Sequence, residues 1–125
     1  MELNLKTYKE FKVWQKAMDL TVEIYRLVKL LPKEETYALS DQMRRAVVSI
    51  PSNIAEGQGR NSTREFINFL GIARGSNSEL ETQLQICVML NYVKNEEAEK
   101  ALNLCTEVGK MLNTLIKKLR QGLDG

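Results

Sequence analysis

The sequence contains no histidine, and this absence removes the most common general base and a frequent metal ligand. It has two cysteines, Cys87 and Cys105, which are too far apart to form a Cys-x-x-Cys motif. We therefore expect no metal site and no cofactor. Both cysteines fall at core-type positions of helical patterns, so we predict buried thiols that behave as small apolar side chains.

Proline, glycine and long apolar runs are also scarce. Two prolines and seven glycines in 125 residues supply few of the turns that an all-β fold requires. No apolar run approaches the ~20 residues that a membrane-spanning helix needs. The N-terminus lacks the apolar segment of a signal peptide. We expect one domain, residues 1–125, in the cytoplasm, with no membrane partner and no small-molecule substrate.

Apolar residues recur every three or four positions along most of the chain, which is typical of helices that face a core. Pro32 ends the first helix, Ser40 is the expected N-cap of the second, and Ser62 with Glu65 forms a capping box for the third. Gln121–Gly125 should fray. The helices are predicted over about residues 9–31, 41–56, 63–92 and 96–119. Short loops make consecutive helices antiparallel, so we expect an all-α, up-down-up-down four-helix bundle.

Pro51 lies about ten residues into the second helix, where it removes an amide donor and crowds the carbonyl of Val47. We predict a kink at this proline. Gly71 and Gly75 lie in the third helix, where glycine is unfavourable. They predict either a close approach of the Pro51 segment or a flexible hinge.

A polar stripe runs beside the apolar stripe of the second helix, opposite the small residues of the third. Amides and hydroxyls at such positions favour a buried hydrogen-bonded network. The expected members are Gln42, Arg45, Ser49, Asn53, Glu56, Ser76 and Glu79. Glu56, Glu79 and Glu81 are also the carboxylates that an enzyme of this kind would use. Di-metal bundles pair such carboxylates with histidine, so we expect no enzymatic activity and no catalytic residue.

The first helix is apolar on two faces. Its second apolar stripe contains Trp14, Met18, Val22 and Tyr25. A helix in a small bundle needs one apolar face, so the second stripe indicates either a wide core contact or an interface between subunits.

Basic residues gather at one predicted end of the bundle, where the first and third helices begin and the second and fourth end. They are Lys6, Lys9, Lys12, Lys16, Arg60, Arg64, Lys117, Lys118 and Arg120. With five acidic residues nearby, this basic pole carries a balance of +4, and the opposite end carries −2. The pole is either a solvated lysine-rich end that favours solubility or an attractor of a nucleic-acid backbone.

Several segments resemble a known family, the bacterial four-helix bundle proteins also called 23S rRNA intervening-sequence proteins. The resemblance covers about residues 10–92 and is most specific in Ser49-Ile50-Pro51-Ser52-Asn53-Ile54-Ala55-Glu56-Gly57. The other matching segments are Val13-Trp14-Gln15-Lys16-Ala17, Leu31-Pro32-Lys33-Glu34-Glu35, Gln42-Met43-Arg44-Arg45-Ala46, Glu65-Phe66, Phe69-Leu70, Ala73, Gly75-Ser76, Glu79-Leu80-Glu81 and Gln83. Asn77 stands where the family has an apolar residue.

The resemblance implies a left-handed four-helix bundle that assembles into a ring, a homopentamer. A related branch of the family, the accessory protein of diversity-generating retroelements, implies RNA or DNA as a partner. The resemblance carries no catalytic residues. The alternative function is an oligomeric scaffold that contacts proteins and has no nucleic-acid role.

Overall fold

Four long helices make up most of the chain. The computed structural model describes residues 7–124, and it contains no strand among these residues. The long helices are α1 (Lys12–Leu27), α2 (Leu39–Gln58), α3 (Thr63–Met89) and α4 (Asn95–Asp124). Three short 3₁₀ helices lie between or before them: η1 (Tyr8–Glu10), η2 (Val28–Leu30) and η3 (Lys33–Glu35). The all-α class is therefore confirmed.

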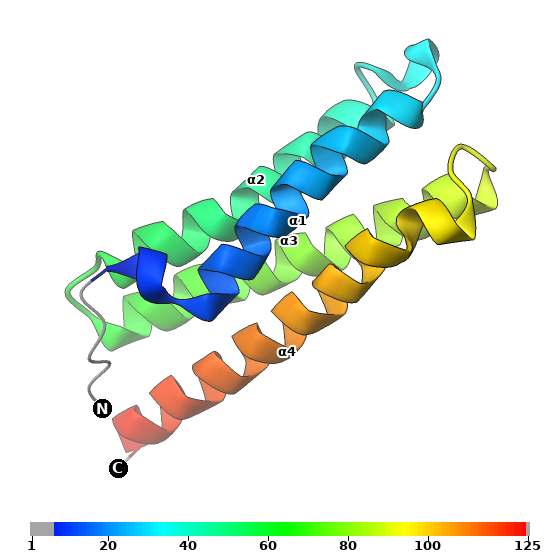
Figure 1. Cartoon of the computed structure of the whole chain (residues 1–125). Helices are drawn as coiled ribbons and strands as arrows, with labels where there is room; N and C mark the ends of the chain where they lie inside the picture. The colour runs from blue at the N-terminus through cyan, green and yellow to red at the C-terminus, as the bar shows by residue number, and fades with distance from the viewer. Residues whose placement is uncertain (1–6, 125) are drawn as a thin grey trace.

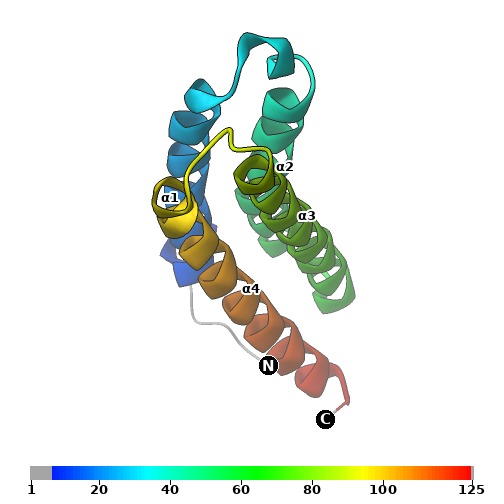
Figure 2. The same ribbon diagram turned by 90° about the vertical axis from the view of Figure 1, so that its right-hand side faces the viewer.

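Consecutive long helices run in opposite directions. The α1–α2 and α3–α4 connections lie at one end of the molecule, and the α2–α3 connection lies at the other (Figure 1). Each long helix packs against two neighbours, and Figure 2 shows α1 and α4 on one side with α2 and α3 on the other. This arrangement fits an up-down-up-down four-helix bundle. The left-handed twist, the kink at Pro51 and the ring remain predictions.

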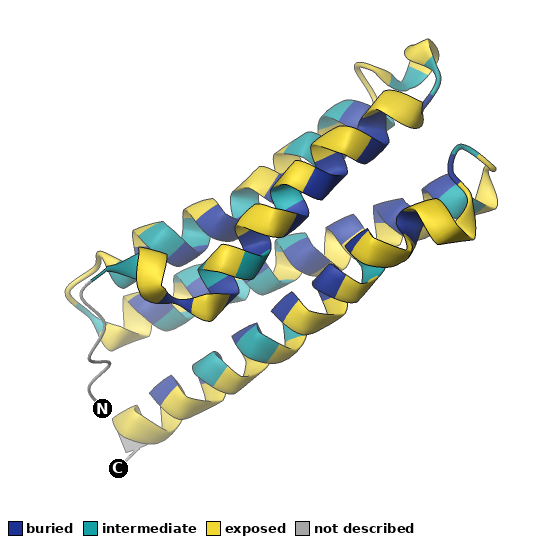
Figure 3. Ribbon diagram, viewed as in Figure 1, coloured by how far each residue is buried: buried dark blue, intermediate teal, exposed yellow. Residues whose placement is uncertain are grey.

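The core is built from the inward stripes of all four helices (Figure 3). Among the fully buried side chains, Leu20, Met43 and Leu80 come from three different helices. Both cysteines are free and buried, as predicted. Burial, with a smaller contribution from nearby Glu35, raises the pKa of the Cys87 thiol to about 11.

Seven of the eight helix ends differ from the expected ones, by one to five residues. Ser40 is not the N-cap of α2, because the helix begins at Leu39 after Ala38 and Ser40 is buried inside its first turn. A carboxylate oxygen of Glu35 instead accepts a hydrogen bond from the Leu39 amide at 3.3 Å. α4 continues to Asp124 and so includes most of the segment that the sequence predicted to fray. Ser62 caps α3 as expected, since its Oγ accepts a hydrogen bond from the Glu65 amide.

The close approach between α2 and α3 occurs at a different glycine from the expected ones. A Cβ atom at Gly71 or Gly75 would meet nothing within 4 Å, because both residues lie on the outward side of α3. A Cβ atom at Gly57 would lie 2.6 Å from the Cβ of Phe69 and 3.0 Å from Cδ1 of Phe66. The predicted close approach at Gly71 and Gly75 was therefore wrong, and Gly57 is the residue that lets the two helices meet.

Candidate functional site

The described residues of the basic pole lie at the end of the bundle that holds the α2–α3 connection. The start of α1, the end of α2, the start of α3 and the end of α4 all lie there (Figure 1). Lys6 lies outside the described residues. The other eight basic residues of the pole belong to η1, α1, the α2–α3 connection, α3 and α4; Lys16 is half-buried and the other seven are exposed.

Two of these eight cations have partners. Lys16 pairs with Glu107 at 3.2 Å, between α1 and α4. Arg60 pairs with Glu56 at 2.9 Å, and its guanidinium lies 4.9 Å from the centre of the Phe69 ring. Within residues 7–124, the remaining six form no salt bridge: Lys9, Lys12, Arg64, Lys117, Lys118 and Arg120. These six side chains are free to attract an external anion.

The two helices that meet at this end bring two of the arginines together. Arg64 from α3 and Arg120 from α4 line one hollow of about 240 Å³. Ile67, Asn68 and Leu123 form the rest of its wall. Two guanidinium groups beside one hollow can hold a phosphate through paired hydrogen bonds.

Lys110 is a basic residue that the sequence analysis missed. It lies on α4 and shares a groove with Lys12 and Lys118. Lys110 and Lys118 are eight residues apart, a spacing that recurs on one face of a helix, and that spacing was the available signal. The cationic surface therefore extends further along α4 than the sequence analysis assumed.

The polar stripe of α2 forms a smaller cluster than expected. Ser49 and Ser76 share a hydrogen bond of 2.9 Å, and Asn53 donates to the Ser49 hydroxyl at 2.9 Å and to its carbonyl at 2.7 Å. The other expected members lie elsewhere: Gln42 is exposed, Arg45 pairs with Asp41, Glu56 pairs with Arg60, and Glu79 accepts from Gln83. The cluster is thus a joint between two helices rather than an extended network.

Two buried amide oxygens have no hydrogen-bond partner among the described residues. They are Oδ1 of Asn77 and Oε1 of Gln83. The Asn77 amide group still donates to the Cys105 carbonyl at 2.9 Å, which joins α3 to α4. Burial, followed by the charge of Glu81, raises the pKa of the Cys105 thiol to about 12.

The second apolar stripe of α1 is divided between core and surface. Trp14 is half-buried and packs against the core, with the Tyr8 ring 5.3 Å away. Met18, Val22 and Tyr25 are exposed by 40%, 60% and 43%. These three side chains form the α1 apolar face, which no other part of the described chain covers.

No group of three or more cysteine, aspartate and glutamate side chains that could hold a metal ion is found within residues 7–124. Over the same residues, no helix combines the length and apolar character needed to cross a membrane.

Residues 9–114 match the model of the family described as 23S rRNA-intervening sequence protein. A solved structure of a protein of unknown function from the S23 ribosomal protein family of Bacteroides thetaiotaomicron is 34% identical in sequence. It superposes with a TM-score of 0.78 over 84% of this chain and 98% of the other. No significant match is found among curated proteins. The resemblance seen in the sequence is thereby confirmed.

Proposed function

Because the chain belongs to the 23S rRNA-intervening sequence protein family, we propose that it is a non-enzymatic, oligomeric protein that binds nucleic acid through its basic pole. The family description names a ribosomal RNA insertion, and the similar solved structure has no assigned function. Neither gives a ligand for this chain. The proposal rests on the six exposed cations of the basic pole that form no salt bridge with any residue the structure describes.

The charges at the two ends of the bundle support this function over simple solvation. Lysines and arginines near the end of α4 suit the negative end of that helix. The helix dipole gives no such reason for Lys9 and Lys12 at the start of α1. Cations on four separate elements converge at one end, and such a surface attracts phosphates without reading bases.

Assembly would multiply these contacts. The α1 apolar face offers Met18, Val22 and Tyr25 to a second copy, and contiguous exposed apolar side chains of this kind mark interfaces. A ring would bring several basic poles to one side, where one nucleic-acid strand could contact more than one subunit. The number five comes from the family resemblance. The cytoplasm is the proposed location.

Charge reversal at the basic pole tests the function. The variant carries Lys9→Glu, Lys12→Glu, Arg64→Glu and Arg120→Glu. Its control carries Lys29→Glu, Lys33→Glu, Lys94→Glu and Lys100→Glu at the opposite end, where all four lysines are exposed. Both variants change the net charge equally. Fluorescence anisotropy with labelled single-stranded RNA and duplex DNA measures affinity at low salt.

The pole variant should lose binding, and the control should bind at least tenfold more tightly than the pole variant. Wild-type affinity should fall steeply between about 50 and about 200 mM salt, because released counterions drive the binding. Equal losses in both variants, or undetectable wild-type binding at low salt, would contradict the proposal. The scaffold function would then be the better account of the same assembly.

A further inference from the structure

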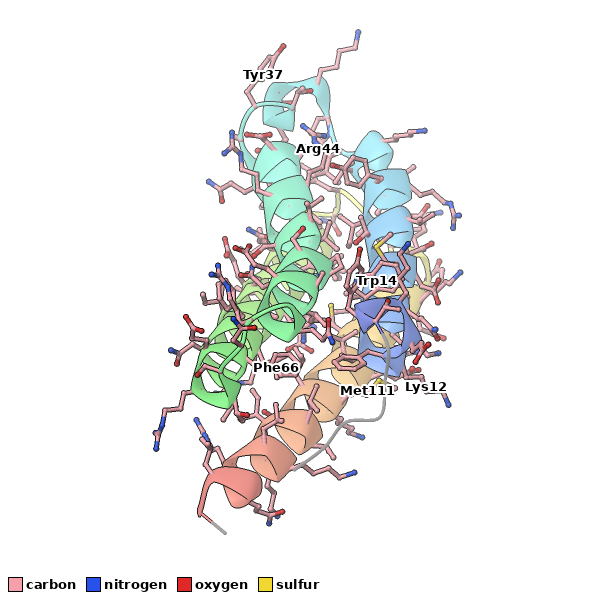
Figure 4. All side chains as sticks on the ribbon, turned by 90° about the vertical axis from the view of Figure 1, so that its left-hand side faces the viewer. Lys12, Trp14, Tyr37, Arg44, Phe66 and Met111 are labelled. Carbon is pink, nitrogen blue, oxygen red and sulfur yellow. The ribbon has the colours of Figure 1, made fainter. Side chains whose placement is uncertain are left out.

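A groove of about 400 Å³ opens between the start of α1 and the second half of α4. Its floor consists of Phe11, Val13, Met111 and Leu115, which are buried or half-buried apolar side chains. Figure 4 shows Met111 beside Lys12 at this position. The volume lies within the ~300–1,000 Å³ that is common for small-molecule sites.

Ammonium groups surround this apolar floor. Lys12, Lys110 and Lys118 line the groove, are exposed, and form no salt bridge within the part of the chain that the structure describes. Glu10 is the one carboxylate in the lining, so the rim carries a net charge of +2. The long stems of lysines can cover an apolar ligand while their charged ends meet an anionic group.

We propose that this groove binds an anionic amphiphile, an unbranched apolar chain with a carboxylate head, such as a medium-chain fatty acid. An alkyl chain needs no hydrogen bonds, and the apolar floor offers none. A nucleobase has polar edges that require several partners, and the side-chain lining offers them little beyond the Thr114 hydroxyl and Glu10. The proposal does not depend on nucleic-acid binding, although both sites would use Lys12 and Lys118.

Chain length provides the sharpest test on the full-length wild-type protein. Calorimetric titration with octanoate and decanoate below their micelle concentrations should show one saturable site per chain. Each buried methylene should tighten binding about fourfold, so decanoate should bind about fifteenfold more tightly than octanoate. Decanol lacks the charge and should bind more weakly than decanoate, and decylamine should not bind at the site.

Two variants locate the site. Leu115→Glu places a carboxylate on the floor and should abolish decanoate binding, and Ile72→Glu, at an exposed position of α3, should not change it. Lys110→Glu should weaken binding at least tenfold. Lys110 is exposed, so Lys110→Glu still tests the proposal if circular dichroism shows that Leu115→Glu does not fold.

Other occupants of the groove give different results. If Leu115→Glu lowers the assembly mass in light scattering and wild type binds no decanoate, a second copy occupies the groove and the proposal is wrong. If decanoate binds only after residues 1–6 are deleted, the chain's own N-terminal segment is the occupant, which also overturns it. Equal affinity for decanol and decanoate would exclude the lysines as the head-group site.

Discussion

Ser49 and Ser76 face each other across the α2–α3 interface, with their hydroxyl oxygens 2.9 Å apart. Asn53 donates to the same Ser49 oxygen, so one amide and two hydroxyls satisfy one another between two helices. Pro51 lies within this segment and removes one backbone donor from α2. The cluster therefore holds α2 against α3 where the backbone ladder is weakest.

A double-mutant cycle on this pair should reveal coupling. Ser49→Ala and Ser76→Ala should each lower the free energy of unfolding by about 1 kcal/mol, because each removes the hydrogen bond that joins the two hydroxyls. The double variant should lose less than the sum of the two, with a coupling of about 0.5–1.5 kcal/mol. Urea unfolding monitored by circular dichroism measures all four proteins. Strict additivity would show that the two hydroxyls do not interact.

Gly57 and Gly75 should respond to alanine in opposite ways. Gly57→Ala forces a methyl group to within 2.6 Å of the Phe69 Cβ, which should cost about 1–3 kcal/mol as α2 and α3 separate. Gly75→Ala adds a methyl group to open space on a helix surface and should stabilise by about 0.5–1 kcal/mol. Thermal unfolding of the two variants compares them directly. A neutral Gly57→Ala would mean that Phe66 and Phe69 can move aside at little cost.

The helical fold could be predicted because apolar spacing reports which side of each helix faces the core. The same spacing does not show at which residue two neighbouring helices approach each other most closely. Glycine is costly within a helix, and for this reason a close approach of α2 was predicted at Gly71 and Gly75. The contact that excludes a side chain is at Gly57 instead. In the sequence, Gly57 is only a glycine near the end of a helix. The packing of Phe66 and Phe69 against it shows that this position has no room for a side chain.

The candidate site shows the same limit. The convergence of charge at one end followed from helix order alone, so the basic pole could be predicted. Ion pairing could not, because Lys16 meets Glu107 from a helix far along the chain. Glu56 was expected in the buried network, but Arg60 lies one turn away and pairs with it at the surface. The groove between α1 and α4 had no sequence signature, since its apolar floor and its lysines come from both helices.

The two cysteines should be unreactive in the folded protein. Burial raises the pKa of Cys87 from 9.0 to about 11 and that of Cys105 from 9.0 to about 12, so both remain protonated thiols near neutral pH. A thiol reagent at about pH 8 should label neither residue in buffer and both in denaturant. Rapid labelling of either residue in buffer would show local opening of the core.

The same thiols should make stability fall at alkaline pH. At a pH between its unfolded-state and folded-state pKa values, such a thiol keeps its proton in the folded chain and loses it in the unfolded chain. Unfolding then releases that proton, and stability is lost as pH rises from about 9 toward about 11. Urea unfolding between these values should show a steeper decline in wild type than in Cys87→Ala. If stability falls equally steeply with pH in both proteins, groups other than Cys87 cause the loss of stability at alkaline pH.

Arg60 and Arg64 should contribute differently to nucleic-acid binding, although they lie four residues apart. Arg64 is exposed and without a salt bridge among the described residues, while Arg60 is held by Glu56 and lies over Phe69. Arg64→Ala should reduce the slope of log affinity against log salt by about 1, as expected for the loss of one phosphate contact. Arg60→Ala should reduce it less, because part of its charge is already neutralised. Anisotropy titrations at several salt concentrations measure both slopes, and equal slopes for the two variants would contradict this distinction.

Val22 provides the test of assembly. It is 60% exposed at the centre of the α1 apolar face, so Val22→Glu removes no core contact and should change the free energy of unfolding by less than about 0.5 kcal/mol. Within an interface, the same carboxylate would be buried without a partner, and the complex should dissociate. Light scattering at micromolar concentration should give a multiple of 14.3 kDa for wild type and a lower mass for the variant.

Tyr37→Glu is the matched control, because Tyr37 is 94% exposed and lies outside the α1 apolar face. The mass of this variant should equal that of wild type. A wild-type mass of 14.3 kDa would contradict assembly, and an oligomer that Val22→Glu leaves intact would place the interface elsewhere on the bundle.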